Sequence, residues 1–137
     1  MTDTKSLELP KNIQWQQWVE RWDRMQERYL VQRDERIKLL VRLVCEAVSP
    51  VSRVLDLGCG TGSLMQPFLD AFPEAEIYGI DFDPVLLPLA QQRLRSYGTR
   101  SQLILADMRS EDWQAKLPKI FDAVISATAL HWLTEVQ

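Results

Sequence analysis

Residues 54–62 read VLDLGCGTG, and this stretch decides the fold. Its apolar first half predicts a buried strand, and Gly58, Gly60 and Gly62 predict a tight turn in which the backbone can approach a ligand closely. A helix that begins directly after the turn would offer free N–H groups to an anionic part of that ligand. The spacing is not the G-x-G-x-x-G of dinucleotide sites, because Ser63 follows Gly62. We therefore predict a cofactor-binding turn, the alternative being a plain strand–turn–helix connection.

The composition is that of a single globular domain. The chain has 137 residues, 46% of them hydrophobic, and a formal net charge of −3. A negative chain lacks the electrostatic footprint of nucleic-acid binding, so we expect no DNA or RNA partner. Cys45 and Cys59 form neither a disulfide framework nor a paired metal motif, so we expect no metal. The sequence shows no signal-peptide pattern and no run of ~20 apolar residues, which predicts a cytoplasmic protein with no membrane partner.

Residues 1–50 are predicted to form a helical segment. Apolar side chains recur at steps of three and four along its first helix, namely Trp15, Trp18, Trp22, Met25 and Tyr29. Two interpretations are open for this stripe. The one we favour is packing against the domain, because aromatic residues at helical spacing usually build core. In the other, the helix is a lid over a substrate pocket.

Residues 51–137 alternate between strands and helices. The pattern predicts strands at 54–57, 76–80, 102–106 and 121–127, and helices at about 63–71, about 83–98 and from about 129 onward. Asp83 and Pro84 provide the cap and the first-turn proline of the second of these helices. Such alternation predicts an α/β fold with a doubly wound parallel sheet and helices on both faces.

Three acidic residues lie where such a sheet binds ligands, at the carboxyl ends of its strands. Asp81 follows the second strand nineteen residues after Gly62, close to the ~20-residue spacing at which an acid meets ribose hydroxyls. Asp107 follows the third strand, where it would accept a hydrogen bond from an exocyclic amine. Asp56 belongs to the first strand, where a carboxylate is costly unless it is hydrogen-bonded. It either ties down the glycine turn or receives the amino group of a cofactor.

Four segments together resemble the class I S-adenosylmethionine (SAM) dependent methyltransferases. They are VLDLGCGTG, IYGIDFDP, LILADM and FDAVISATALHWL, in that order between Val54 and about Leu133. The resemblance implies a Rossmann-like sheet and SAM as cofactor. It places the amino acid part of SAM at the glycine turn, the ribose at Asp81 and the adenine between Asp107 and Met108. The implied cofactor-binding set is Asp56, Gly58, Cys59, Gly60, Gly62, Asp81, Phe82, Asp107 and Met108.

The run ALHWL at residues 129–133 is similar to the small-molecule group that includes trans-aconitate and malonyl-acyl-carrier-protein methyltransferases. This similarity implies a small-molecule methyl acceptor. His131 is the single histidine of the chain, and its ordinary pKa near neutrality suits a general base. The alternative is a residue that merely lines the pocket or packs beside Trp132.

Members of this family typically continue past the fourth strand with three more, whereas this sequence ends at Gln137. We therefore expect the N-terminal, cofactor-binding part of a methyltransferase, in a helical segment (1–50) and an incomplete α/β core (51–137). The alternative is a non-catalytic SAM-binding or regulatory remnant that acts through a partner chain. An apolar fourth strand without a further neighbour would be an open edge, so we also expect self-association through it.

Overall fold

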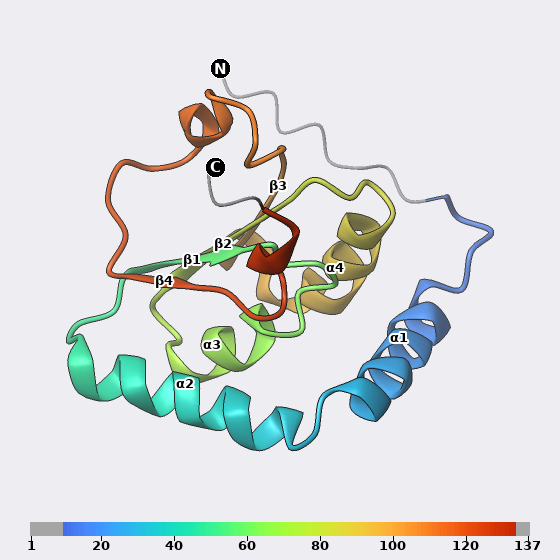
Figure 1. The fold of residues 1–137 in the computed structure, drawn as a ribbon, viewed down its shortest axis with the longest axis horizontal. Helices are drawn as coiled ribbons and strands as arrows, with labels where there is room; N and C mark the ends of the chain where they lie inside the picture. The colour runs from blue at the N-terminus through green and yellow to red at the C-terminus, as the bar shows by residue number, and fades with distance from the viewer. Residues whose placement is uncertain (1–9, 134–137) are drawn as a thin grey trace.

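Four parallel strands form one sheet in the computed structural model, which describes residues 10–133 (Figure 1). The strands are β1 (Arg53–Leu57), β2 (Glu76–Asp81), β3 (Ser101–Leu105) and β4 (Ala123–Ile125), and their order across the sheet is β3-β2-β1-β4. The predicted α/β fold with a parallel sheet is therefore confirmed.

The strand register brings the predicted ligand-binding residues to one edge of the sheet. Leu57 at the end of β1 pairs with Ile80, and Asp81 at the end of β2 pairs with Leu105, the last residue of β3. On the other side, Asp56 pairs with Ile125 at the end of β4. The carboxyl ends of all four strands are thus nearly level, and the loops after them meet above that edge.

The helices pack in pairs. The α-helices are α1 (Trp15–Tyr29), α2 (Arg33–Ala47), α3 (Met65–Ala71) and α4 (Leu86–Leu94). Because α3 and α4 each connect a strand to its next neighbour in the same direction, right-handed crossovers place both on one face of the sheet. In Figure 1, α2 lies beside α3 and α1 beside α4, as their contacts also show. None of the helices within residues 10–133 combines the length and hydropathy that a membrane span requires.

Several predicted boundaries shift. The second predicted helix begins only at Leu86 and continues after Leu94 as a 3₁₀ segment, η1 (Arg95–Arg100). Pro84 lies in a turn in which the Asp83 carboxylate accepts the Val85 N–H at 2.8 Å, so Asp83 shapes the approach to the helix. After β4 the chain forms a 3₁₀ turn, η3 (Leu130–Trp132), instead of an α-helix.

Strand β4 is shorter than the predicted 121–127, and side-chain contacts hold the chain against β1 at both of its ends. Directly before the strand, the Asp122 N–H still donates to the Arg53 carbonyl at 2.9 Å. The Asp122 carboxylate accepts the backbone N–H groups of Ser52 and Arg53 at 2.7 and 2.8 Å. After the strand, the Ser126 hydroxyl donates to the Leu57 carbonyl at 2.8 Å. These contacts still hold the chain against β1, so the loop after β4 stays at the ligand-binding edge.

The core lies between the sheet and the α3–α4 face, where Phe68, Met65, Leu69 and Ile77 are fully buried. Gly79 in β2 makes this packing possible. A Cβ at Gly79 would overlap the Met65 sulfur and lie 2.8 Å from the Cys59 sulfur. Cys59 is itself buried in this core.

The favoured interpretation of the α1 stripe is wrong for most of its residues. Val19 is the buried residue of α1, whereas Trp18 is 51% exposed, Met25 41% and Tyr29 77%. Much of the stripe stays outside the core because α1 packs on α4 at the periphery and not on the sheet.

A buried arginine attaches α1 to the domain. Arg93 on α4 donates from Nη2 to Asp23 Oδ1 on α1 at 2.7 Å, and from Nε to the Thr61 carbonyl at 2.9 Å. Its side chain is only 10% exposed. One side chain therefore joins the N-terminal helix to the glycine turn.

Candidate functional site

A cavity of about 850 Å³ opens at the carboxyl edge of the sheet. Its volume falls in the range of sites for cofactors and drug-sized molecules, roughly 300–1,000 Å³. One wall is the glycine turn with the ends of β1 and β2, and the opposite wall comes from α1 and α2, including Trp22, Tyr29 and Leu40.

The structure brings nearly all predicted site residues to this cavity. Those that line it are Asp56, Gly58, Cys59, Gly60, Asp81, Phe82, Asp107, Met108 and His131. Gly62 is buried outside the lining, where a Cβ would lie 2.9 Å from the Leu94 Cδ1 atom and 3.3 Å from the Ala90 Cβ atom. Its place in the motif reflects close packing of the turn against α4.

The glycine turn is held by its own amides. The N–H groups of Gly58 and Cys59 both donate to the Ile80 carbonyl, at 2.8 and 3.0 Å, and that of Gly62 donates to the Cys59 carbonyl at 2.8 Å. Helix α3 begins only at Met65. The helix therefore starts two residues later than predicted, and four amides of the turn, including that of Gly60, already donate within the protein.

Asp81 joins the turn to the end of β2. Its Oδ2 accepts the Gly60 N–H at 2.8 Å and its Oδ1 accepts the Asp83 N–H at 2.9 Å. Because a carboxylate has about four lone-pair sites, each oxygen retains one for a ligand hydroxyl. Asp81 thus combines a structural contact with an acceptor that faces the cavity.

Asp56 and Thr61 have buried oxygens without a partner. Among the described residues, neither carboxylate oxygen of Asp56 nor the Thr61 hydroxyl has a hydrogen-bond partner, although Asp56 is only 1% exposed and Thr61 2%. Burial, and secondarily the nearby charge of Asp81, raises the pKa of Asp56 well above its usual value. No bond links Asp56 to the glycine turn, so the first of its two proposed roles has no support. A hydrogen-bond donor of a bound ligand would supply the partner that the Asp56 oxygens lack.

We expect Asp56→Asn to stabilise the free protein at neutral pH. The pKa of Asp56 is higher in the folded than in the unfolded chain. The folded state therefore becomes less stable relative to the unfolded chain as the pH rises above the ordinary value of 3.8. The melting temperature of the variant should exceed that of the wild type by several degrees at pH about 7, at about 3–5 °C per ~1 kcal/mol. The two should converge below pH about 4. Scanning calorimetry across this range measures the difference.

Asp112→Asn is the matched control, because Asp112 is exposed and should leave the melting temperature unchanged. A destabilised Asp56→Asn protein would show instead that the carboxylate has a partner within the fold. Asp56→Asn should also bind a cationic ligand more weakly than the wild type. Its effects on stability and on binding thus have opposite signs and can be measured separately.

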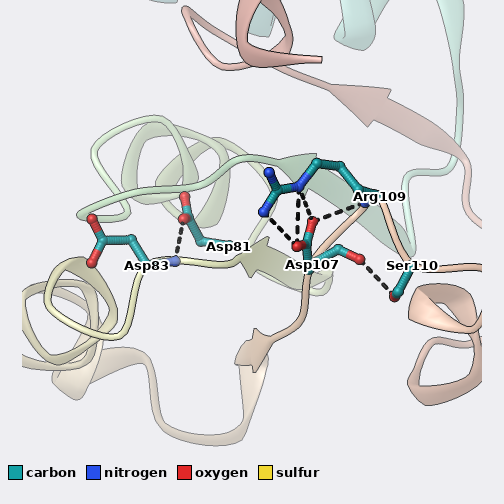
Figure 2. A network of polar contacts seen from close by, with 5 residues as sticks. All are labelled: Asp81, Asp83, Asp107, Arg109 and Ser110. Atoms are coloured by element: carbon teal, nitrogen blue, oxygen red, sulfur yellow. Dashed lines mark hydrogen bonds and ion pairs between the residues drawn. The ribbon is translucent and has the colours of Figure 1, made fainter. Parts of the chain in front are cut away.

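Asp107 at the end of β3 is bound by Arg109, two residues on (Figure 2). Arg109 Nη2 donates to Asp107 Oδ2 at 2.7 Å, and Nε donates to Oδ1 at 2.9 Å. These hydrogen bonds lower the pKa of Asp107 to about 2. The Arg109 guanidinium also lies over the Phe82 ring, with Cζ 5.6 Å from the ring centroid.

Two arginines of α2 line the cavity and were not predicted from the sequence. Arg33 donates to the Ser63 hydroxyl directly after the glycine turn, and Arg36 is exposed one helical turn further on. Neither is in an ion pair with any residue that the structure describes. Their place depends on how α2 docks on α3, which no spacing in the sequence encodes.

His131 lies in η3 and lines the cavity, exposed. Its general-base role stays a prediction. Within residues 10–133, no three histidine, cysteine, aspartate or glutamate side chains form a group suited to a metal ion.

A sequence model of the family described as "Methyltransferase domain" matches residues 54–137. The chain belongs to this methyltransferase family. The match begins at β1 and includes the strand ends and loops that carry the acidic and glycine wall of the cavity. Residues of α1 and α2 lie outside the matched range.

Curated relatives of this methyltransferase chain are much longer. It is 33% identical over 97 residues to a malonyl-[acyl-carrier protein] O-methyltransferase of Anoxybacillus flavithermus, covering 71% of this chain and 35% of that protein. It is 29% identical over 100 residues to a trans-aconitate 2-methyltransferase of Acidovorax ebreus, covering 72% of this chain and 36% of that one. The chain thus spans about a third of the length of these relatives.

Among solved structures, the methyltransferase chain is similar to SAM-bound CalS10, an amino pentose methyltransferase from Micromonospora echinaspora. The TM-score is 0.65 with 29% sequence identity, over 93% of this chain and 49% of CalS10. The likeness to CalS10 covers 93% of this chain, more than the family match to residues 54–137, so it includes the N-terminal helices. The Rossmann-like fold of the sequence prediction is confirmed.

Proposed function

We propose that this chain is the cofactor-binding part of a SAM-dependent methyltransferase that acts on a small molecule. The observation that carries the proposal is Asp56, a buried carboxylate at the cavity wall whose oxygens lack partners among residues 10–133. SAM carries an ammonium group, which is the kind of charged donor that such a carboxylate needs. Family membership and the SAM-bound relative CalS10 support the same cofactor.

The residues present fit this cofactor at each of its polar parts. Asp56 would accept the ammonium group, and Asp81, with one free site on each oxygen, would accept the ribose hydroxyls. Arg33, beside Ser63 and outside any ion pair in the described part of the chain, would meet the carboxylate. Phe82 and Met108 would flank the adenine, with Asp107 at its amine. When bound, SAM supplies a methyl group on a positively charged sulfur.

We propose an acceptor that carries a carboxylate. Arg36 lines the cavity, is exposed and has no ion-pair partner among the described residues. Malonyl and aconitate groups, named for two relatives, are carboxylates. An ionised carboxylate oxygen attacks without losing a proton, so His131 would be needed as a base only for a hydroxyl or amine acceptor. The protein then accelerates the reaction mainly by aligning the acceptor oxygen with the methyl group, which can lower the activation barrier by ~7–11 kcal/mol.

The N-terminal segment 1–50 is proposed as a lid over this site, with 51–137 as the cofactor-binding core. Trp22, Tyr29 and Leu30 line the cavity from α1 and the residue after it, although α1 is far from the sheet in sequence. Closing such a wall around the acceptor excludes water and holds the reacting atoms in line.

Calorimetric titration with SAM, followed by product analysis with a panel of acceptors, tests the proposal. We expect SAM to bind, and a malonyl thioester or a tricarboxylate to be methylated in preference to an amino sugar. Preference for the amino sugar would contradict the carboxylate assignment alone. SAM binding without methylation of any acceptor would favour the alternative of a non-catalytic SAM-binding remnant. An absence of SAM binding would overturn the function.

Self-association of the 137-residue chain through β4 stays part of the proposal. In the described residues β4 pairs with β1 alone, and Val124 is 59% exposed. Light scattering should detect dimers or larger species, and Val124→Lys should reduce them, because a charge on an edge strand opposes strand addition. Ile120→Lys is the control, since Ile120 is equally apolar and 74% exposed but lies outside the strand. A monomeric wild type would contradict this prediction.

A cytoplasmic location and the absence of a nucleic-acid partner are also proposed, from the absence of a signal-peptide pattern and from the negative net charge of the sequence.

A further inference from the structure

Both oxygens of the Asp107 carboxylate are engaged by Arg109. Its Oδ1 accepts the backbone N–H and the Nε of Arg109, both at 2.9 Å. Its Oδ2 accepts the same Nε at 3.1 Å and the Nη2 at 2.7 Å. These four contacts come from three N–H groups, because the single Nε–H is shared between the two oxygens, and they take up most of the roughly four lone-pair sites of a carboxylate. Asp107 lines the cavity, and the Arg109 guanidinium occupies the edge of its carboxylate that a ligand amine would need.

Arg109 also covers the neighbouring aromatic surface. Its Cζ atom lies 5.6 Å from the centroid of the Phe82 ring, and Phe82 is itself 53% exposed at the cavity. Figure 2 shows the guanidinium on the side of Asp107 that faces Asp81, the residue proposed to hold the ribose. A guanidinium is planar, stacks on aromatic rings and presents an edge of N–H donors to a carboxylate. An adenine ring is likewise planar and stacks on aromatic rings, and its exocyclic amine donates an N–H group to a carboxylate.

We propose that Arg109 is an affinity-determining residue that competes with the cofactor for its adenine subsite. This inference rests on the proposed function. The Arg109 side chain must leave both Asp107 and Phe82 before the base binds there. Both partners of the ion pair are well exposed, with side-chain exposures of 53% and 40%. Exposed pairs of this kind are weak, so the exchange has a small cost and takes place readily.

Adenosine is the sharpest probe, because it is neutral and makes no charge interaction with Arg109. We expect Arg109→Gln to bind adenosine about three- to tenfold more tightly than the wild type, the combined effect of an exposed ion pair and a cation–π contact. Raising the salt concentration from about 0.01 M to about 1 M shortens the screening length from ~30 Å to ~3 Å. The wild-type affinity for adenosine should therefore increase with salt, and that of Arg109→Gln should not.

Arg42→Gln is the matched control. Arg42 is an exposed arginine in a surface pair with Glu46 and does not line the cavity, so its loss should change neither adenosine affinity nor salt dependence. Both variants should melt within about a degree of the wild type, because surface substitutions have small effects. Weaker or unchanged adenosine binding by Arg109→Gln would overturn the inference, since it would mean that Arg109 clamps the base or does not meet it. In either case wild-type SAM binding would leave the proposed function standing, whereas a wild type that binds neither SAM nor adenosine would contradict both.

Discussion

Replacing Asp81 with alanine is expected to reduce the affinity for SAM by at least about 100-fold. Hydrogen bonds from two hydroxyls to one carboxylate contribute roughly 1.5–3 kcal/mol each, and about 1.4 kcal/mol corresponds to a factor of ten in affinity. The substitution also removes the acceptor for the Gly60 N–H, which helps to hold the glycine turn against β2. Calorimetric titration with SAM and with adenosine measures the loss.

The structure refines the choice of variants for this test. Asp81→Asn retains one oxygen for a backbone N–H but loses the charge, so its binding defect should remain while the turn is less disturbed. Asp83→Asn is the control, because Asp83 also lines the cavity but uses its carboxylate on the Val85 N–H, a contact that asparagine reproduces. An Asp81→Asn protein with wild-type affinity would exclude Asp81 as the ribose acceptor.

Gly60→Val is expected to abolish SAM binding with much less effect on the fold. Gly60 has a φ of +52°, and the nearest atom to a Cβ built there is Leu86 Cδ1 at 3.8 Å, which is ordinary contact. The side chain would therefore extend into open cavity, where it would meet the cofactor. The cost to folding is the strain of a β-branched residue at positive φ, on the order of 1–3 kcal/mol. Circular dichroism and SAM titration on the same sample separate the two effects.

Gly58→Val and Gly79→Val provide the contrast, because at both positions a Cβ has no space even without a ligand. It would overlap the Ala129 Cβ atom at Gly58, and the Met65 sulfur at Gly79. We expect both variants to lose the folded state, as overpacked cores do. Gly60→Val that unfolds to the same extent would show that the turn is a structural connection and not a binding surface.

The motif at residues 54–62, together with the alternation of strands and helices after it, was sufficient to predict the sheet and the acidic wall of the site. The reason is geometric: parallel strands of similar length end at one edge, so a residue placed at a strand end by periodicity is also placed at the cavity. Asp56 and Asp81 end up at that edge by the strand register, Asp107 follows two residues after β3, and all three line the cavity. The end of β4 and the start of α4 were less well predicted, because both depend on single side-chain contacts, that of Ser126 with Leu57 and that of Asp83 with Val85.

The opposite wall could not be predicted from local pattern. The stripe on α1 has the period of a core helix, yet the helix docks at the edge of the domain and leaves Trp18 and Met25 exposed. Arg33 and Arg36 reach the cavity only because α2 packs on α3, a contact between segments about thirty residues apart. The pairing of Asp107 with Arg109 depends on the rotamer of a long side chain. Each of these features is set by tertiary packing, which a single sequence does not state.

The contacts by which Arg93 joins α1 to the glycine turn have a practical consequence for anyone who shortens this protein. An expression fragment trimmed to residues 54–137, the range that the family match delimits, would retain Arg93 but discard Asp23, its carboxylate partner. A nearly buried guanidinium would then face the Thr61 carbonyl without its carboxylate partner, so we expect the fragment to be less stable than the whole chain. The same cut would uncover the apolar surface of α3 that Ile37 and Leu40 shield. Boundaries drawn by sequence similarity would thus divide a unit that folds together, and fragments intended for ligand screening should begin before α1.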